Sequence, residues 1–150
     1  MNTGFVQRLD RLKKDCTLSD LNRAWFGSNF DFMPSHYDSH RYASLNLNNI
    51  WRDTHTVEFR LFNATAHAGE VKANIALCLA ICAQAKIKKN ASMRNPYTFD
   101  AGCAKYDMRV RMIKLDLIGA EFENVRMHLT KRLTGNSRNS TRRTLAQRAA

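Results

Sequence analysis

Hydrophobic residues near the start of the chain recur at helical spacing. Phe5, Leu9 and Leu12 fall on one face of the segment 4–14, and basic side chains occupy the other face. This pattern predicts an amphipathic helix whose apolar side packs on the rest of the protein.

A second short helix is predicted to begin at Thr17. Thr17 and Asp20 have the spacing of a variant capping box, in which each residue satisfies a backbone N–H of the other. Residues 27–40 combine Gly, Asn, Ser and Pro with three bulky rings. They are predicted to form a loop that packs against the protein.

The pattern then changes to a period of two. The segments 41–47 and 56–62 both alternate apolar and polar residues, which is typical of half-buried strands. The short polar link between them favours an antiparallel hairpin. Asn46, Glu58 and Arg60 would then share the face opposite the core.

Three further helices are predicted after a loop at 63–69. The segment 70–85 is apolar nearly all round, which predicts a deeply buried helix. Helices are also predicted over 103–117 and 120–133, with Gly135 as a C-cap. The inner faces of these two helices are predicted to carry Tyr106, Val110, Ile113, Leu117, Phe122, Val125, Leu129 and Leu133.

These elements predict an α+β fold in which an antiparallel β-hairpin packs with about five helices. We expect one domain over residues 1–135. Residues 136–150 contain four arginines and no acid, so they are predicted to form a flexible basic tail.

The composition is globular, but the charge is unusual. Hydrophobic residues make up 44% of the chain and charged residues 25%. Lys and Arg number 24 against 13 acids, a net charge of +11 that attracts polyanions. Nucleic acid, an acidic protein partner and a merely solvated basic face are all compatible with it.

Basic residues gather in the loop 86–96 and in the tail. Such clusters can neutralise phosphates and give salt-dependent binding that is largely independent of sequence. The candidate polyanion-binding residues are Lys86, Lys88, Lys89, Arg94, Arg138, Arg142 and Arg143.

The four cysteines match neither a zinc ribbon nor a disulfide framework, and Cys78 and Cys82 are expected to be core residues. His36 and His40 lack further ligands at metal-binding spacing, so they are read as surface histidines. No secretory signal is evident, and the longest apolar run is too short to cross a bilayer. A reduced, cytoplasmic protein without membrane contact is the expectation.

The tripeptide Glu58-Phe59-Arg60 is the sharpest candidate for chemistry. A strand places the acid and the arginine on one face, about 7 Å apart along the chain. A carboxylate can hold Mg²⁺, and a guanidinium grips phosphate or carboxylate in bidentate fashion. Taken alone, the same pattern is also typical of a solvated surface ion pair.

A wider context supports the chemical interpretation. The segments RYASLNL, TVEFRLFNATAHAGEVKANIALCLAICAQA and LDLIGAEFENVRMHLTKRL resemble the C-terminal half of the amidoligase family over roughly residues 20–135. These are ATP-dependent carboxylate–amine ligases related to glutamine synthetase and γ-glutamylcysteine synthetase.

The resemblance implies a partial glutamine-synthetase-like fold with the ligase site on a sheet. It implies that Glu58 binds Mg²⁺ and that Arg60 binds phosphate or a substrate carboxylate, so both would be catalytic. Arg41, Asn46 and His67 would bind substrate or nucleotide. The implied cofactors are Mg²⁺ and ATP, provided that another chain completes the site.

The sequence also departs from the family. Relatives begin with a strand carrying a Gly-x-Glu-x-Glu type motif that supplies further metal-binding carboxylates, and residues 1–40 contain nothing similar. One strong acidic ligand holds Mg–ATP poorly. We therefore expect the chain to lack the N-terminal ATP-binding half, to be inactive as an isolated enzyme, and to need a partner protein.

Two non-enzymatic interpretations stay open. The chain could be a basic protein derived from this fold that contacts nucleic acid or a nucleoprotein complex, for example as a mobile-element or phage inhibitor of host defence such as an anti-CRISPR. It could also be a homodimer that pairs sheet edges, because a two-stranded sheet is only marginally stable without cover.

Overall fold

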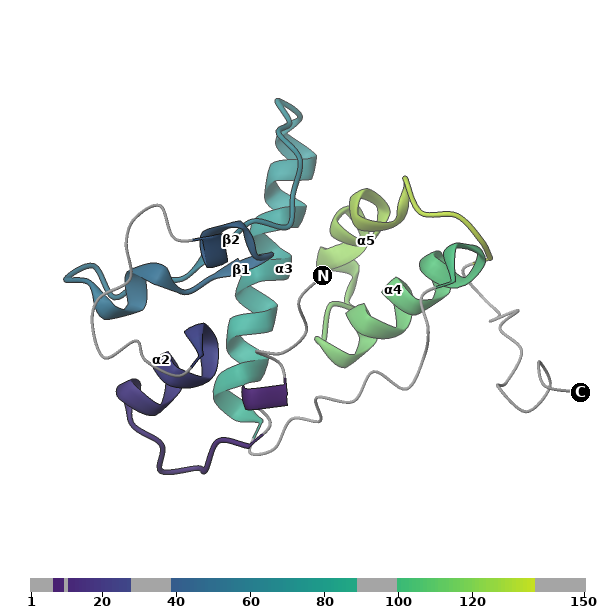
Figure 1. Cartoon of the computed structure of the whole chain (residues 1–150). Helices are drawn as coiled ribbons and strands as arrows, with labels where there is room; N and C mark the ends of the chain where they lie inside the picture. Colours follow the sequence, from purple (N-terminus) through teal and green to yellow (C-terminus); the bar gives the residue numbers. More distant parts are fainter. Residues whose placement is uncertain (1–6, 10, 28–38, 89–99, 137–150) are drawn as a thin grey trace, which may run out of the picture. The chain divides into compact units, whose positions relative to one another are not determined.

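The computed structural model describes residues 7–9, 11–27, 39–88 and 100–136. Its tertiary contacts cluster in two compact units, Met1–Asn63 with Ala91–Arg94 and Ala64–Asn90 with Asn95–Ala150. Within the described ranges the chain forms four α-helices and one antiparallel sheet of two strands, which confirms the α+β class (Figure 1). The predicted division into a domain of 1–135 and a tail of 136–150 stays a prediction, and the tail lies almost wholly outside the described residues.

The first unit contains the predicted helix at Thr17. Helix α2 spans Leu18–Phe26, and its capping box is formed. The Thr17 hydroxyl accepts from the Asp20 backbone N–H at 3.2 Å, and the Asp20 carboxylate accepts from the Thr17 N–H at 2.8 Å. Of the helix predicted over 4–14, residues 7–9 are helical and a turn follows.

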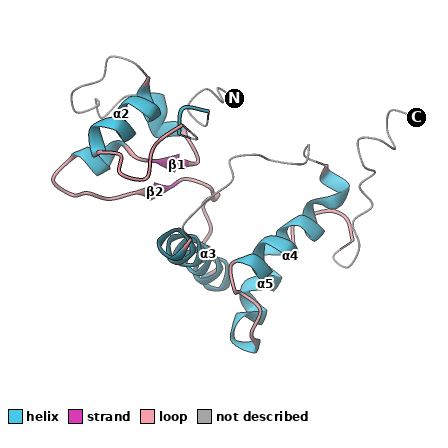
Figure 2. Ribbon diagram, turned by 90° about the horizontal axis from the view of Figure 1, so that it is seen from below, coloured by secondary structure: helices cyan, strands magenta, loops and turns pink. Residues whose placement is uncertain are grey.

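The core of this unit joins α2 to the hairpin. Trp25, Phe26 and Leu47 are buried, and Phe26 meets the Trp51 ring edge-on with centroids 5.3 Å apart. Figure 2 shows α2 beside the two strands. Leu9 packs partly buried against the same cluster. The apolar face predicted for 4–14 therefore contacts this core through Leu9.

The hairpin has the predicted direction but is much shorter than predicted. Strand β1 is Leu45–Asn46 and strand β2 is Glu58–Phe59, paired antiparallel with Leu45 opposite Phe59 and Asn46 opposite Glu58. The prediction of seven-residue strands was wrong. Short 3-10 helices at Ser39–Tyr42 and Asn48–Trp51 flank β1.

Strand β1 ends after Asn46 because of a local hydrogen bond. The Asn46 side chain accepts from the backbone N–H of Asn48 at 3.0 Å, a local bond that competes with the ladder. The chain then turns and buries Leu47. On the second segment, Val57 and Leu61 are 43% and 49% exposed, so the predicted apolar row of 56–62 is not buried.

The second unit is helical. Helix α3 spans Ala68–Ile87, α4 spans Ala104–Lys114 and α5 spans Glu123–Thr130, and α5 packs on both of the others. The three predicted helices are therefore present, with shorter α4 and α5. The described parts of this unit are drawn in teal, green and yellow in Figure 1.

The predicted burial of α3 was wrong. Ala73 and Leu77 are its buried residues. A row at every fourth position is exposed instead, with Val71 at 41%, Ile75 at 55% and Leu79 at 64%. Helix α5 covers one side of α3, and this apolar row lies on a side that the described residues leave in solvent.

Helix α3 is also the one described helix that is long and apolar enough to cross a membrane, judged by length and composition. Apolar core helices of soluble proteins meet the same criterion, so this is weak evidence. The expectation that the protein makes no membrane contact remains a prediction.

The inner face of α4 also differs from its prediction. Met112 is buried, whereas Ile113 is 55% exposed, and burial continues through Leu115 and Leu117 after the helix ends. Since α4 ends at Lys114, the helical spacing that placed Ile113 and Leu117 on one face does not hold.

Gly135 is not the C-cap of the last helix, because α5 ends at Thr130 and is capped by Lys131. Gly135 has a left-handed φ of +93° instead. A side chain there would collide with the backbone carbonyl of Gly102. Glycine is thus required by a close approach between the segment after α5 and the one before α4.

Candidate active site

A hydrogen-bonded cluster of three polar side chains lies on the hairpin. Asn46 and Glu58 are cross-strand partners, and the Asn46 amide donates to the Glu58 carboxylate at 2.8 Å. The Arg60 guanidinium lies 3.5 Å from the other Glu58 oxygen. The Arg60 backbone N–H donates to the Ser44 carbonyl at 2.8 Å, which continues the strand pairing by one residue.

Tyr42 connects two arginines to this cluster. The guanidinium carbons of Arg41 and Arg60 each lie 5.6 Å from the centre of the Tyr42 ring, within the range of a cation–π contact. Tyr42 is 72% exposed. The arrangement therefore presents two cations and an aromatic ring next to one carboxylate.

Solvent reaches both charged partners. The side chain of Glu58 is 50% exposed and that of Arg60 is 32% exposed. Exposed ion pairs contribute about 0–1 kcal/mol to stability. The Glu58–Arg60 pair is thus weak enough that a ligand can replace either partner. Asn46, in contrast, is buried, and its hydrogen bond holds the Glu58 carboxylate in position.

The cluster does not by itself fit a magnesium ion. Mg²⁺ prefers several oxygen ligands in octahedral geometry. Both Glu58 oxygens already have partners, and no group of three His, Cys, Asp or Glu residues that could hold a metal occurs within the described ranges. Further carboxylates would have to come from residues or chains beyond those described.

His67 has a structural role in the second unit. Its Nδ1 accepts from the backbone N–H groups of Gly69 and Glu70 at 3.1 and 3.4 Å, so it is the N-cap of α3. The ring packs 4.9 Å from that of His128 in α5. Because Nδ1 is the acceptor, the neutral ring carries its proton on Nε2.

Glu70 follows in the first turn of α3. It pairs with Lys131 and with Arg132, the latter at 3.2 Å. The hydrogen bond with Lys131, then that with Thr65, and the charge of Arg132 lower the pKa of Glu70 from 4.5 to about 2. This carboxylate joins α3 to the segment after α5.

The predicted polyanion-binding residues are described only in part. Lys86 lies in the last turn of α3 and Lys88 is its C-cap, and both are exposed. Cations at this end complement the partial negative charge of the helix terminus. The remaining candidates, Lys89, Arg94, Arg138, Arg142 and Arg143, lie outside the described residues.

Two residues at the hairpin were missed by the sequence interpretation. Tyr42 was assigned only to the outer row of a strand, and its exposed ring between two arginines was not foreseen. Asn48 is 3% exposed, and its side-chain amide makes no hydrogen bond in the described part of the chain. The Asn46-Leu47-Asn48 pattern could have indicated the role of Asn48, because two amide side chains that flank a buried leucine are unusual in a core.

The fold and the cluster together define an α+β protein with an acid–arginine pair on a small sheet. The chain matches, over residues 1–82, the model of a family described as "Putative amidoligase enzyme". The match covers more than half of the 150 residues, and the chain belongs to this family. No curated protein and no solved structure matches the chain.

The matched range contains Arg41, Asn46, Glu58, Arg60 and His67. It starts earlier than residue 20, where the resemblance was expected to begin, and stops within α3. The family membership predicted from the sequence is confirmed. The predicted roles of the five residues are not tested by it.

Proposed function

We propose that the hairpin supplies Glu58 and Arg60 to the active site of an ATP-dependent carboxylate–amine ligase with a glutamine-synthetase-like architecture. The observation that carries the proposal is the Asn46–Glu58–Arg60 cluster in a chain of the amidoligase family. In this reaction a substrate carboxylate attacks the γ-phosphate of ATP and releases ADP. An amine then attacks the acyl phosphate, so that the new C–N bond replaces the bond to phosphate.

Arg60 is suited to bind the anionic partner. A guanidinium donates two parallel hydrogen bonds to a phosphate or carboxylate, and Arg41 adds a second cation across the Tyr42 ring. Positioning and charge neutralisation supply most of the catalysis in phosphoryl transfer.

Glu58 and Arg60 would act in a coupled way. An anion that binds Arg60 competes with the Glu58 carboxylate for the guanidinium. Glu58 then loses its cationic partner but keeps the Asn46 hydrogen bond. Glu58 would then be available as one ligand of Mg²⁺, and a bound Mg²⁺ would neutralise phosphate charge. We propose that a partner chain supplies the remaining acidic ligands and that the isolated chain is inactive.

The test is amine-dependent ADP release by the chain mixed with candidate partner chains that carry acidic metal-binding motifs. Glu58→Gln and Arg60→Ala are each expected to lower the rate at least about a hundredfold, the range found for groups that stabilise transition-state charge. Glu123→Gln and Arg109→Ala remove matched exposed groups in the second unit and should leave the rate unchanged. Activity that survives both hairpin substitutions would refute the proposal.

Calorimetry with Mg–ATP on the isolated chain is a second measurement. Binding that Arg60→Ala abolishes would support the ligase site even without a partner. Binding that is unaffected by Arg60→Ala and Glu58→Gln would place the nucleotide elsewhere and count against the hairpin.

A further inference from the structure

Two histidine rings meet where helix α3 begins. His67 directly precedes α3, and His128 lies in α5, which packs on α3 (Figure 2). The ring centroids are 4.9 Å apart, and the ring planes are inclined by 54°. A side chain at Gly69 would collide with Nε2 of His128, so glycine leaves the space that this ring occupies. The histidine pair therefore joins the first turn of α3 to α5.

His67 caps α3 through a nitrogen that must be free of a proton. Its Nδ1 accepts from the Gly69 N–H at 3.1 Å and from the Glu70 N–H at 3.4 Å. The Glu70 N–H also donates to the His67 carbonyl at 2.9 Å, whereas the Gly69 N–H has the ring as its acceptor among the described residues. A protonated imidazole carries N–H on both nitrogens and accepts no hydrogen bond. Proton uptake by His67 therefore removes the cap.

The His128 ring also lies where an added proton is unfavourable. Its Nδ1 is buried and has no hydrogen-bond partner within the described part of the chain. A buried N–H without an acceptor costs free energy, and the cost is larger when the group is charged. Protonation of both rings would place two like charges side by side at the positive end of α3.

The charged groups around the histidine pair are already matched. Glu70, in the first turn of α3, forms ion pairs with Lys131 and Arg132, which follow α5. The pKa of Glu70 is lowered to about 2, so this carboxylate stays charged at the pH values where histidine titrates. Residues 63–66, before His67, carry no charge. The remaining charged side chains of α3 and α5 are Lys72, Lys86, Glu123 and Arg126.

We propose that the His67–His128 pair is a pH-sensitive switch, which holds the start of α3 on α5 when both rings are neutral and releases it when they take up protons. Histidine is the side chain whose charge ordinarily changes between pH 5 and 8. The closed state binds fewer protons on these rings than the released state, so it loses stability as the pH falls through that range. The switch uses none of the hairpin residues, and its test is therefore independent of the ligase test.

The experiment is urea unfolding of the whole chain at pH 7.5 and pH 5.5, followed through NMR amide signals of α3 and α5. In the parent chain the unfolding constant of the second unit should rise about tenfold at the lower pH, within the roughly 2- to 30-fold that loss of an N-cap side chain produces. His67→Asn keeps a preferred N-cap acceptor that does not titrate in this range. It should stay within about threefold of the parent at pH 7.5 and should lose most of the rise.

Two further variants separate the pair from histidines in general. His128→Phe keeps an aromatic ring beside His67 and removes the second titrating group, so it should also reduce the rise. His55→Asn is the matched control. The Nδ1 of His55, in the first unit, donates to the Ile50 carbonyl at 2.8 Å, and protonation keeps such a donor. This substitution should leave the pH dependence of the second unit unchanged.

Ring ¹⁵N chemical shifts of the parent chain test the switch without any variant. At pH 7.5 they should report the proton of His67 on Nε2, and the amide signal of Gly69 should move as His67 takes up its second proton. A proton on Nδ1 of His67 at pH 7.5 would overturn the proposal. So would a rise in the unfolding constant of His67→Asn and His128→Phe that equals the rise in the parent.

Discussion

Lys131, just after α5, forms an ion pair with Glu70 in the first turn of α3. Glu70 also lies at the N-terminus of a helix of twenty residues, where the helix dipole favours a negative charge. The pairing thus ties two helices of the second unit together through one carboxylate, which is 14% exposed.

This relationship predicts sensitivity to acid. Folding lowers the pKa of Glu70 from 4.5 to about 2, mainly through the Lys131 hydrogen bond. A lowered pKa contributes stability that is complete above the unfolded value and is lost as the pH falls through the folded value. The second unit should therefore lose stability between about pH 4.5 and pH 2, measured by urea unfolding at a series of pH values.

The variant Glu70→Gln should be less stable at pH 7 and should lose less stability over that acidic range. Glu123→Gln, a substitution in the first turn of α5, is the matched control and should keep the pH dependence of the parent chain. An identical acid profile for the parent and Glu70→Gln would contradict the pairing.

A second prediction compares alanine substitutions at two glycines. At one the cost comes from backbone strain alone, and at the other a steric collision adds to it. Gly27 and Gly135 both have left-handed φ angles, of +100° and +93°. A methyl group at Gly27 meets nothing within 4 Å, whereas one at Gly135 would collide with the Gly102 carbonyl. Gly27→Ala should cost about 1–3 kcal/mol from strain alone, because its φ of +100° with ψ of 176° is a conformation that is essentially restricted to glycine.

Gly135→Ala should cost a further 1–3 kcal/mol or so, because a backbone carbonyl cannot rotate away as a side chain can. Chemical unfolding measured with probes in each unit gives both values. Equal costs at the two positions would show that the segment after α5 does not approach Gly102 closely.

A third prediction concerns the buried amide of the hairpin. Asn46→Ala removes the hydrogen bonds to Glu58 and to the Asn48 N–H and should cost about 1–3 kcal/mol. Asn46→Asp keeps an oxygen for Asn48 but sets a carboxylate against Glu58. It should be the more destabilising change at pH 7 and should recover towards pH 4 as the introduced carboxyl group gains a proton and the repulsion is relieved.

The measurement is the free energy of unfolding of the three proteins at both pH values. The control is Asn124→Asp, an exposed position in α5 of the second unit, which should change stability little at either pH. If Asn46→Asp were as stable as the parent at pH 7, the Asn46–Glu58 hydrogen bond would not exist in solution.

The fourth prediction orders the cysteines by reactivity. Cys16 is exposed, Cys78 and Cys82 are half-buried, and Cys103 is completely buried. Burial, and secondarily the nearby Cys82, raises the pKa of the Cys78 thiol, which lowers its thiolate fraction at neutral pH.

Alkylation with iodoacetamide, followed by mass spectrometry, should therefore modify Cys16 first, Cys78 slowly and Cys103 last. In urea the differences should largely disappear, because accessibility and not intrinsic chemistry causes them. Early labelling of Cys103 in the folded protein would show that the start of α4 opens readily.

Local signals in the sequence were sufficient to predict the elements whose cause is local. The Thr17–Asp20 capping box specified the start of α2, because both partners lie within one turn. The apolar run after residue 70 specified α3. The spacing of Glu58 and Arg60 predicted that their side chains lie together, because residues two apart in a strand point to the same face. Family membership was also predictable, since it depends on the order of residues.

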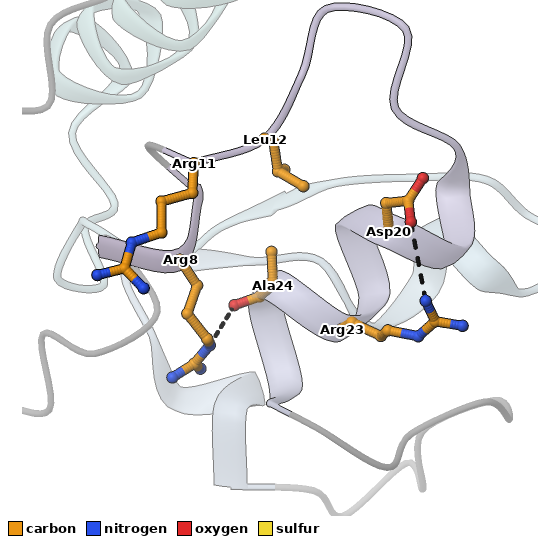
Figure 3. A pocket seen from close by; sticks show the side chains of 6 residues that line it. All are labelled: Arg8, Arg11, Leu12, Asp20, Arg23 and Ala24. Carbon is orange, nitrogen blue, oxygen red and sulfur yellow. Dashed lines mark hydrogen bonds and ion pairs between the residues drawn. The ribbon is translucent and has the colours of Figure 1, made fainter.

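Tertiary structure decided what depends on neighbours distant in sequence. The alternation that predicted long strands also covers residues that form 3-10 helices around β1, where the Asn46–Asn48 hydrogen bond acts together with burial of Leu47 against Trp25 and Phe26. The apolar sequence of α3 could not show that one side packs on α5 while Ile75 and Leu79 stay exposed. The open pocket lined by Arg8, Arg11 and Arg23 likewise required the N-terminal turn to pack beside α2 (Figure 3). Burial and shared surfaces arise from packing between segments, and the pattern along one segment does not contain that information.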